Sequence, residues 1–158
     1  MNCATCDVSL EDGSLVVIHA MAGHELELSY QDFLESKAQC SAGSGFAPTW
    51  MHDSLFDFQS FAVDWSLRKG RSALFEDCGL GKSRQELVWA ENIVRHTNKP
   101  VLILTPLAVG KQIVAEAKAV ELEAKLSRGK VHKGINVTNY EKLHLFNPSD
   151  FGGCVCDE

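Results

Sequence analysis

The residues with the clearest chemical potential in this chain stand together in a short glycine-containing stretch, Gly79-Leu80-Gly81-Lys82-Ser83. Two glycines let the backbone approach an anion closely, because no Cβ stands in the way. Successive N–H groups and the start of a following helix would point partial positive charge at phosphates. In such a loop Lys82 reaches the β- and γ-phosphates, and the hydroxyl of Ser83 binds Mg²⁺. The stretch therefore predicts a phosphate-binding loop.

The surroundings of this loop fit the motif, with one departure. Residues 72–75 form a short apolar run typical of a strand, and residues 82–96 are predicted as a helix, which is the strand–turn–helix context that the motif requires. The strict pattern has glycine where this chain has Glu76. Cys78 and Leu80 complete the loop that we expect to bind the nucleotide. The alternative is a strand–turn–helix corner that holds no ligand.

A second group of candidate residues follows the last apolar run of the sequence. Residues 151–156 are typical of a buried strand, and Asp157 and Glu158 come directly after them. An acidic pair at the carboxyl end of a buried strand, opposite a phosphate loop, forms the second half of a nucleotide site. Asp157 would hold Mg²⁺ through water, and Glu158 would orient or deprotonate the attacking water. The alternative is solvated charge at the end of the sequence.

A glutamine upstream of the loop is a candidate for recognising the base. Residues 55–69 are predicted as an amphipathic helix that Gly70 ends. Gln59 lies on this helix, and its amide both donates and accepts hydrogen bonds, so it can pair with the edge of adenine. The alternative is an ordinary surface glutamine. The aromatic stripe of the same helix is expected to pack in the core: Phe58, Phe61, Ala62 and Trp65.

The rest of the chain alternates between strands and helices. Strands are predicted at residues 101–104 and 135–138, a long helix at 107–126, a basic connector at 127–134 and a short helix beginning at 139–143. Such alternation predicts an α/β domain with a parallel sheet and right-handed crossovers. The expected fold class is a three-layer α/β/α domain preceded by a small α+β element.

Composition limits the class of protein. The 158 residues, 45% hydrophobic and 23% charged, fit one globular domain of ordinary size. No run of about 18 apolar residues exists, and the acidic N-terminus lacks the basic region of a signal peptide. Six cysteines without a small-secreted pattern favour reduced thiols and a cytoplasmic protein. The formal net charge of −6 argues against strong non-specific binding to nucleic acid.

The sequence divides into three predicted parts. Residues 1–28 are a small acidic element, residues 29–54 are a helix at 29–38 followed by a linker, and residues 55–158 are the α/β domain. The first part holds four candidate zinc ligands: Cys3, Cys6, His19 and His24. Their spacing matches a two-Cys/two-His zinc site. A β-branched run fills the place where the helix of such a finger would begin, so a short hairpin with incidental cysteines is the alternative.

Together these motifs resemble the first motor lobe, a RecA-like lobe, of superfamily-two helicases, with the closest likeness to Swi/Snf-type and to phage or bacterial DEAD/DEAH-like members. The resemblance covers roughly residues 30–158. Residues 77–83 resemble motif I of that family, in which the first glycine of the strict pattern is normally absent. The other matching segments are 58–59 for the Q motif, 104–107 for motif Ia, 137–141 for motif Ib and 157–158 for the first half of motif II.

The resemblance implies a P-loop NTPase lobe that binds ATP and Mg²⁺ and contacts the phosphates of DNA or RNA through motifs Ia and Ib. It also implies a second helicase lobe, with the arginine finger, that these 158 residues do not include. We therefore expect the ATP-binding lobe of a helicase or translocase, truncated at motif II, which binds ATP but hydrolyses it slowly and does not unwind nucleic acid alone. The alternative is a non-catalytic nucleotide- or protein-binding module derived from such a lobe.

Overall fold

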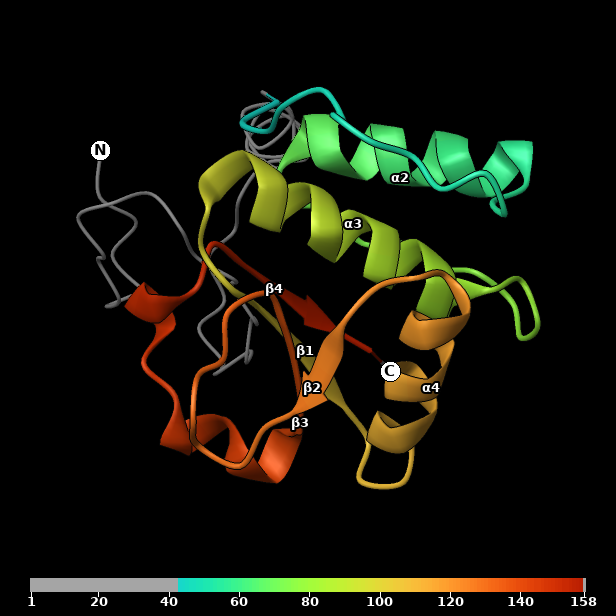
Figure 1. Cartoon of the computed structure of the whole chain (residues 1–158). Coiled ribbons are helices and arrows are strands. Elements are labelled where there is room, and N and C mark those ends of the chain that lie inside the picture. The colour runs from blue at the N-terminus through green and yellow to red at the C-terminus, as the bar shows by residue number, and fades with distance from the viewer. Residues whose placement is uncertain (1–42, 158) are drawn as a thin grey trace, which may run out of the picture.

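The structure, a computed structural model, describes residues 43–157 (Figure 1). The predicted element at residues 1–28 and the predicted helix at residues 29–38 lie outside the described residues. Four strands form one parallel sheet in the order β2-β3-β1-β4. Their bounds are Val101–Thr105 for β1, Ala124–Leu126 for β2, Ile135–Asn139 for β3 and Gly153–Cys156 for β4. The prediction of an α/β domain with a parallel sheet is confirmed.

Strands β1 and β3 form the centre of the sheet. They pair in register, with Val101 beside Ile135, and every residue of both strands is buried. A parallel strand that is covered on both faces carries such a continuous buried run. The one amide in the middle of β3 is also satisfied, because Asn136 accepts from the backbone N–H of His132 and donates to its carbonyl oxygen, both at 2.8 Å.

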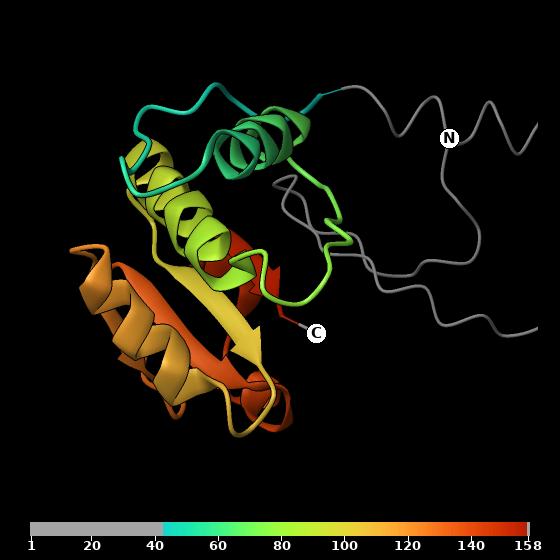
Figure 2. The same ribbon diagram turned by 90° about the vertical axis from the view of Figure 1, so that its right-hand side faces the viewer.

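Helices cover one face of the sheet in two layers. Helix α3 (Lys82–Thr97) packs on β1, β3 and β4, and helix α4 (Gly110–Ala119) packs on β2 and β3. Helix α2 (Asp57–Lys69) lies on α3, on the side away from the sheet (Figure 2). Two fully buried residues, Leu87 of α3 and Ile103 of β1, belong to the hydrophobic cluster between these layers.

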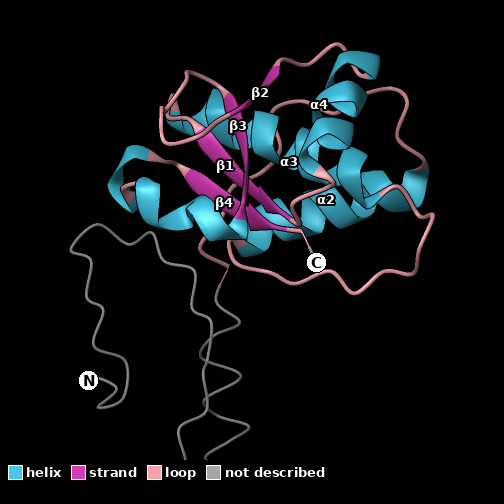
Figure 3. Ribbon diagram, turned by 90° about the horizontal axis from the view of Figure 1, so that it is seen from below, coloured by secondary structure: helices cyan, strands magenta, loops and turns pink. Residues whose placement is uncertain are grey.

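Two short 3₁₀ helices and the residues beside them lie toward the other face of the sheet (Figure 3). They are η1 (Tyr140–Leu145) and η2 (Pro148–Asp150). Phe146 and Phe151 follow them and form a second, smaller cluster with Leu102 and Leu104 of β1. Alternate residues of β1 therefore fill two different cores, one under the helices and one under the 3₁₀ segments. Within residues 43–157 no helix is long and apolar enough to cross a membrane.

The segment before α2 is part of the same packed body. In residues 43–54, predicted as linker, Phe46 and Trp50 pack against the large hydrophobic cluster. The side-chain oxygen of Asn92, a fully buried residue of α3, accepts hydrogen bonds from the backbone N–H groups of Thr49 at 2.9 Å and Trp50 at 3.1 Å. A buried amide thus fixes the approach of the chain to α2.

The prediction that the aromatic stripe of α2 packs in the core is wrong. Phe61 is 71% exposed, Phe58 is 47% exposed and Trp65 is 37% exposed. The buried residues of α2 are Gln59, Val63, Ser66 and Leu67. Helical spacing is compatible with burial of either the aromatic face or the face that carries Gln59, Val63, Ser66 and Leu67. The second face is the buried one, and its polar side chains are satisfied there by hydrogen bonds. The Ser66 hydroxyl, for example, donates to the carbonyl oxygen of Val63 at 2.9 Å.

The long helix predicted at residues 107–126 is also wrong. Helix α4 ends at Ala119, and β2 begins at Ala124. Glu121 takes a left-handed conformation with φ 56°, and the N–H of Leu122 donates back to the carbonyl of Ala117 at 2.8 Å. This pattern closes a helix, but its left-handed position usually carries glycine. A glutamate there gave no stop signal in the sequence.

The strand predicted at residues 72–75 does not form. No residue between α2 and α3 belongs to the sheet, and Leu74 and Phe75 are 39% and 98% exposed. A short apolar run becomes a strand by pairing with a sheet edge and burying a face, and here it does neither. Among the described strands, β4 is left at the end of the sheet, with one edge unpaired.

Candidate functional site

The glycine loop and the start of α3 have the backbone geometry that the sequence predicts. Gly79 and Gly81 both take left-handed conformations, with φ 84° and 78°, and Gly81 caps the helix that begins at Lys82. The first N–H groups of a helix have no partner within the helix, so its N-terminus presents donors and partial positive charge. Ser83 lies in this first turn and is partly buried. Cys78 and Leu80 are exposed in the loop.

Gln59 contacts this loop directly. The residue is 3% exposed, and its amide nitrogen donates to the carbonyl oxygen of Leu80 at 2.7 Å. Its amide oxygen accepts from the backbone N–H of Phe56 at 2.9 Å. A Cβ built on Gly81 would overlap the amide nitrogen of Gln59, so the Gln59 side chain would have to shift, and the left-handed φ of Gly81 favours glycine independently. Gln59 therefore joins α2 to the loop, and adenine recognition by it stays a prediction.

Glu76, the residue at the position of the missing glycine, holds the loop from the other side. Its carbonyl oxygen accepts from the ammonium group of Lys82 at 3.1 Å, and its carboxylate accepts from the side-chain amide of Gln85 at 2.7 Å. Gln85 is 2% exposed, and its amide oxygen is buried without a hydrogen-bond partner. Sequence analysis did not identify Glu76 or Gln85 as loop-holding residues, although the position of Gln85 on the buried face of α3 was a signal.

A carboxyl group on α3 faces the end of β4. Glu86 hydrogen-bonds Asp157, and burial, the charge of Asp157 and this bond raise the pKa of Glu86 to about 8, against an opposing effect of the Lys82 charge. The second carboxyl oxygen of Glu86 is buried without a partner. Glu86 thus links Lys82 at the start of α3 with Asp157 beyond β4. Sequence analysis missed this residue, because a glutamate in an amphipathic helix usually faces solvent.

Asp157 is fixed at the carboxyl edge of the sheet by its backbone. Its N–H donates to the carbonyl oxygen of Leu104 at 2.8 Å, and its carbonyl oxygen accepts from the Tyr140 hydroxyl at 2.7 Å. Burial, with the nearby Cys156 and Asp157 charges, raises the pKa of Tyr140 to about 12, so this hydroxyl remains a donor at neutral pH. Glu158, the predicted catalytic carboxylate, lies outside the described residues.

Two thiols border the same edge. A hydrogen bond from Cys154 lowers the pKa of Cys156 to about 7, while that bond and burial raise the pKa of Cys154. Within residues 43–157 the cysteines are free thiols, and no three histidine, cysteine or acidic residues gather as a metal site. The candidate zinc ligands Cys3, Cys6, His19 and His24 lie outside the described residues.

The arrangement combines a helix N-terminus, two left-handed glycines and a lysine on one side with a fixed aspartate on the other. These groups fit a phosphate with a bound Mg²⁺: N–H donors and an ammonium group for the phosphate, and the oxygens of Ser83 and Asp157 for the cation. Comparison of the chain with family models, with curated proteins and with solved structures finds no match. The site therefore rests on its own geometry.

Proposed function

We propose that this chain is the ATP-binding lobe of a helicase- or translocase-type NTPase. The observation that carries the proposal is the placement of a glycine-capped helix start, at Lys82, and of a backbone-fixed aspartate, Asp157, beyond β4, with Glu86 interacting electrostatically with both. Ligands of open parallel sheets bind outside the carboxyl ends of the strands. A nucleotide phosphate with Mg²⁺ is the ligand whose charges match a lysine, a helix N-terminus and an aspartate together.

In this proposal each residue has one role. The loop from Gly79 to Gly81 surrounds the phosphates, and Lys82 exchanges its bond to the Glu76 carbonyl for the β- and γ-phosphates. Ser83 and Asp157 hold Mg²⁺ directly or through water. Gln59 pairs with adenine by exchanging its bonds to the Leu80 carbonyl and the Phe56 N–H for the edge of the base, and Glu158 orients the attacking water.

The finer fold class follows from the same proposal. The described α/β sheet would gain one more parallel strand from residues 72–75, added at the unpaired edge of β4, to complete a RecA-like P-loop lobe. The segment leads directly into the glycine loop, and its two exposed apolar residues, Leu74 and Phe75, have no partner elsewhere in the described core. Such an addition would cover both the strand edge and these side chains.

Calorimetry with a non-hydrolysable ATP analogue and Mg²⁺ tests the proposal. Lys82→Ala removes a charged donor to the phosphates, which is worth on the order of 1.5–3 kcal/mol, so affinity should fall at least about tenfold. Lys111→Ala, an exposed lysine on α4, is the matched control and should bind as the wild type does. Equal affinities in Lys82→Ala and wild type would refute the assignment of the loop.

Two of the described arginines, Arg68 and Arg95, are already paired at helix ends away from the glycine loop, which favours binding without rapid turnover for this lobe alone. An arginine finger contributes roughly 10³–10⁵ in rate by stabilising charge on the transferred phosphoryl group. Arg95 lies in the last turn of α3, at the opposite end from Lys82, and is paired with Glu91 at 2.7 Å. Arg68 lies in the last turn of α2 and is paired with Asp64 at 2.9 Å.

A steady-state phosphate-release assay, with and without DNA or RNA, checks this point. We expect slow hydrolysis, no stimulation by nucleic acid and no unwinding by these 158 residues. Glu158→Gln serves as the blank. A nucleic-acid-stimulated rate on the order of 1 s⁻¹ that is lost in Glu158→Gln would instead establish a working motor.

A further inference from the structure

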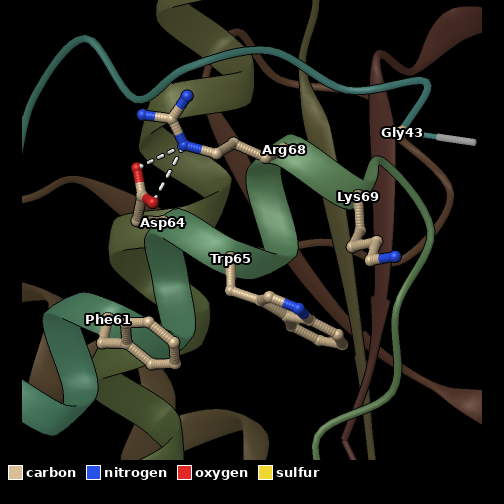
Figure 4. A pocket seen from close by; sticks show the side chains of 6 residues that line it. All are labelled: Gly43, Phe61, Asp64, Trp65, Arg68 and Lys69. Carbon is tan, nitrogen blue, oxygen red and sulfur yellow. Dashed lines mark hydrogen bonds and ion pairs between the residues drawn. The ribbon is translucent and has the colours of Figure 1, made fainter.

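The outer face of α2 carries aromatic side chains that the described core does not use. Phe61 and Trp65 stand one helical turn apart and project from the same side of the helix (Figure 4). They line a shallow hollow of about 240 Å³ whose other lining residues are Gly43, Asp64, Arg68 and Lys69. We call this surface the aromatic face of α2. Two large exposed aromatic residues in one hollow are typical of a covered surface rather than of open solvent contact.

The described chain begins at this face and is fixed there. The N–H groups of Ser44 and Gly45 donate to the carbonyl oxygens of Lys69 at 3.3 Å and Arg68 at 3.2 Å, in the last turn of α2. A Cβ on Gly45 would overlap the carbonyl oxygen of Leu67, so the backbone could not approach so closely with any other residue. Gly43, next in line, is one of the residues that line the hollow. The preceding chain is therefore anchored at one end of the aromatic face.

We propose that the aromatic face of α2 is the docking surface for this chain's own residues 29–38, SYQDFLESKA. Only residues 39–42 separate this segment from Gly43. An extended chain spans at most about 3.6 Å per residue, so Ala38 lies within roughly 18 Å of the hollow. A tether of this length gives the segment an effective concentration near the millimolar range or above, which no separate molecule reaches at ordinary concentrations.

The sequence of the segment complements the surface. At helical spacing, Tyr30, Phe33 and Leu34 form one apolar stripe that would meet Phe61 and Trp65. Gly43, from which the tether extends, lines the same hollow as Arg68 and Lys69 in the last turn of α2.

Charge also favours this occupant over a second copy of the described body. Residues 1–42 hold seven acidic residues and one lysine, a net −6, whereas residues 43–157 hold 13 acidic and 14 basic residues, a net +1. The segment contributes Asp32, Glu35 and Lys37, a net −1, and the rim of the hollow contributes Arg68 and Lys69 beside Asp64, a net +1. The nearly neutral described body offers no such attraction to its own copy.

Limited proteolysis of the full chain with chymotrypsin tests the proposal, with cleavage after Tyr30 and Phe33 followed by mass spectrometry. Cleavage of a docked segment follows the population of its open form. Phe61→Ser removes part of the surface, so cleavage at both sites should become about tenfold faster or more. Cleavage after Phe75, which is 98% exposed, serves as the internal reference and should not change.

Leu107→Ser is the matched control, because Leu107 is as exposed as Phe61 but lies after β1. It should leave cleavage at Tyr30 and Phe33 at the wild-type rate. The reciprocal change, Leu34→Ser, should accelerate cleavage after Tyr30 as Phe61→Ser does. Equal rates in wild type and Phe61→Ser would overturn the proposal. A wild-type dimer, detected by light scattering and converted to a monomer by Phe61→Ser, would overturn it in favour of a second copy.

Discussion

The two halves of the glycine motif differ sharply in how the fold holds them. Helix α3, downstream of the glycines, buries six residues and packs against the sheet, α2 and α4. Residues 71–75, upstream, include no buried residue and no regular structure. The downstream half is determined locally, by a left-handed glycine and an amphipathic helix. The upstream half depends on a strand edge elsewhere in the sheet, so the same short motif contains one half that its own residues fix and one that requires a partner.

The largest expected effect lies in the helical half. Leu87 of α3 is fully buried in the main cluster, so Leu87→Ala should lower the free energy of unfolding by about 2–5 kcal/mol through lost burial and a cavity. Leu74→Ala, in the upstream half, should change it by less than about 0.5 kcal/mol. Urea unfolding of both variants measures the difference. Similar losses would show that residues 71–75 are packed as firmly as α3.

The next effect concerns the junction between the halves. Gly81→Ala introduces both a left-handed alanine and an overlap with the Gln59 amide, so it should cost about 1–3 kcal/mol of stability. Gly79→Ala is the control, because it has the same left-handed backbone but no atom within 4 Å of the added Cβ. The difference between the two free energies of unfolding isolates the contact with Gln59. If the two variants lose the same stability, Gln59 does not support the loop.

A smaller effect appears as a dependence on pH. The pKa of Glu86 is raised from 4.5 to about 8 in the folded state, so the folded protein holds a proton that the unfolded chain releases. The stabilisation from this proton is complete below pH 4.5 and is lost as pH rises through 8. Glu86→Gln should therefore gain stability relative to wild type between pH 5 and pH 9, with the gain levelling off above about pH 8.

Denaturant unfolding at the two pH values provides the measurement for Glu86. Glu91→Gln, a change on the same helix at the ion pair with Arg95, is the control and should keep the wild-type pH dependence. Parallel pH profiles for wild type and Glu86→Gln would mean that Glu86 is not the buried acid next to Asp157.

The same contrast explains what the sequence could predict. The central strands, the start of α3 at Lys82 and the end of α2 at Gly70 all follow from local signals, namely continuous apolar runs and left-handed glycines. The end of α4 did not, because Glu121 takes a position that glycine usually marks. The missing strand at residues 72–75 did not either, because pairing with an edge is a property of the whole sheet.

Within the candidate site, sequence signals identified the residues of the loop but not the neighbouring residues whose interactions hold the loop in place. Lys82, Ser83 and Asp157 stand at positions that a motif specifies. Glu76 and Glu86 became visible only through their contacts with Gln85 and Asp157. The aromatic face of α2 was wrongly predicted to be buried for a related reason. Spacing alone cannot tell which of two helix faces is covered when the covered face includes a bonded glutamine and serine.

The smallest expected change in stability, and a sharp test of the upstream half, comes from Phe75→Ser. Phe75 is 98% exposed, so the substitution should alter the free energy of unfolding of the ligand-free protein by less than about 0.5 kcal/mol. If residues 72–75 pair with the open edge of β4 when a nucleotide binds, Phe75 becomes buried only in the bound state. Its loss should then weaken binding of the ATP analogue by up to about tenfold.

In the wild type, amide hydrogen exchange in residues 72–76 should slow on binding, whereas exchange in the middle of α3 should not change. Leu107→Ser, an equally simple loss of an exposed apolar side chain outside the segment, should keep both the affinity and the exchange pattern. Unchanged affinity in Phe75→Ser, together with unchanged exchange in residues 72–76, would leave the lobe with four described strands in both states and would remove this segment from the nucleotide site.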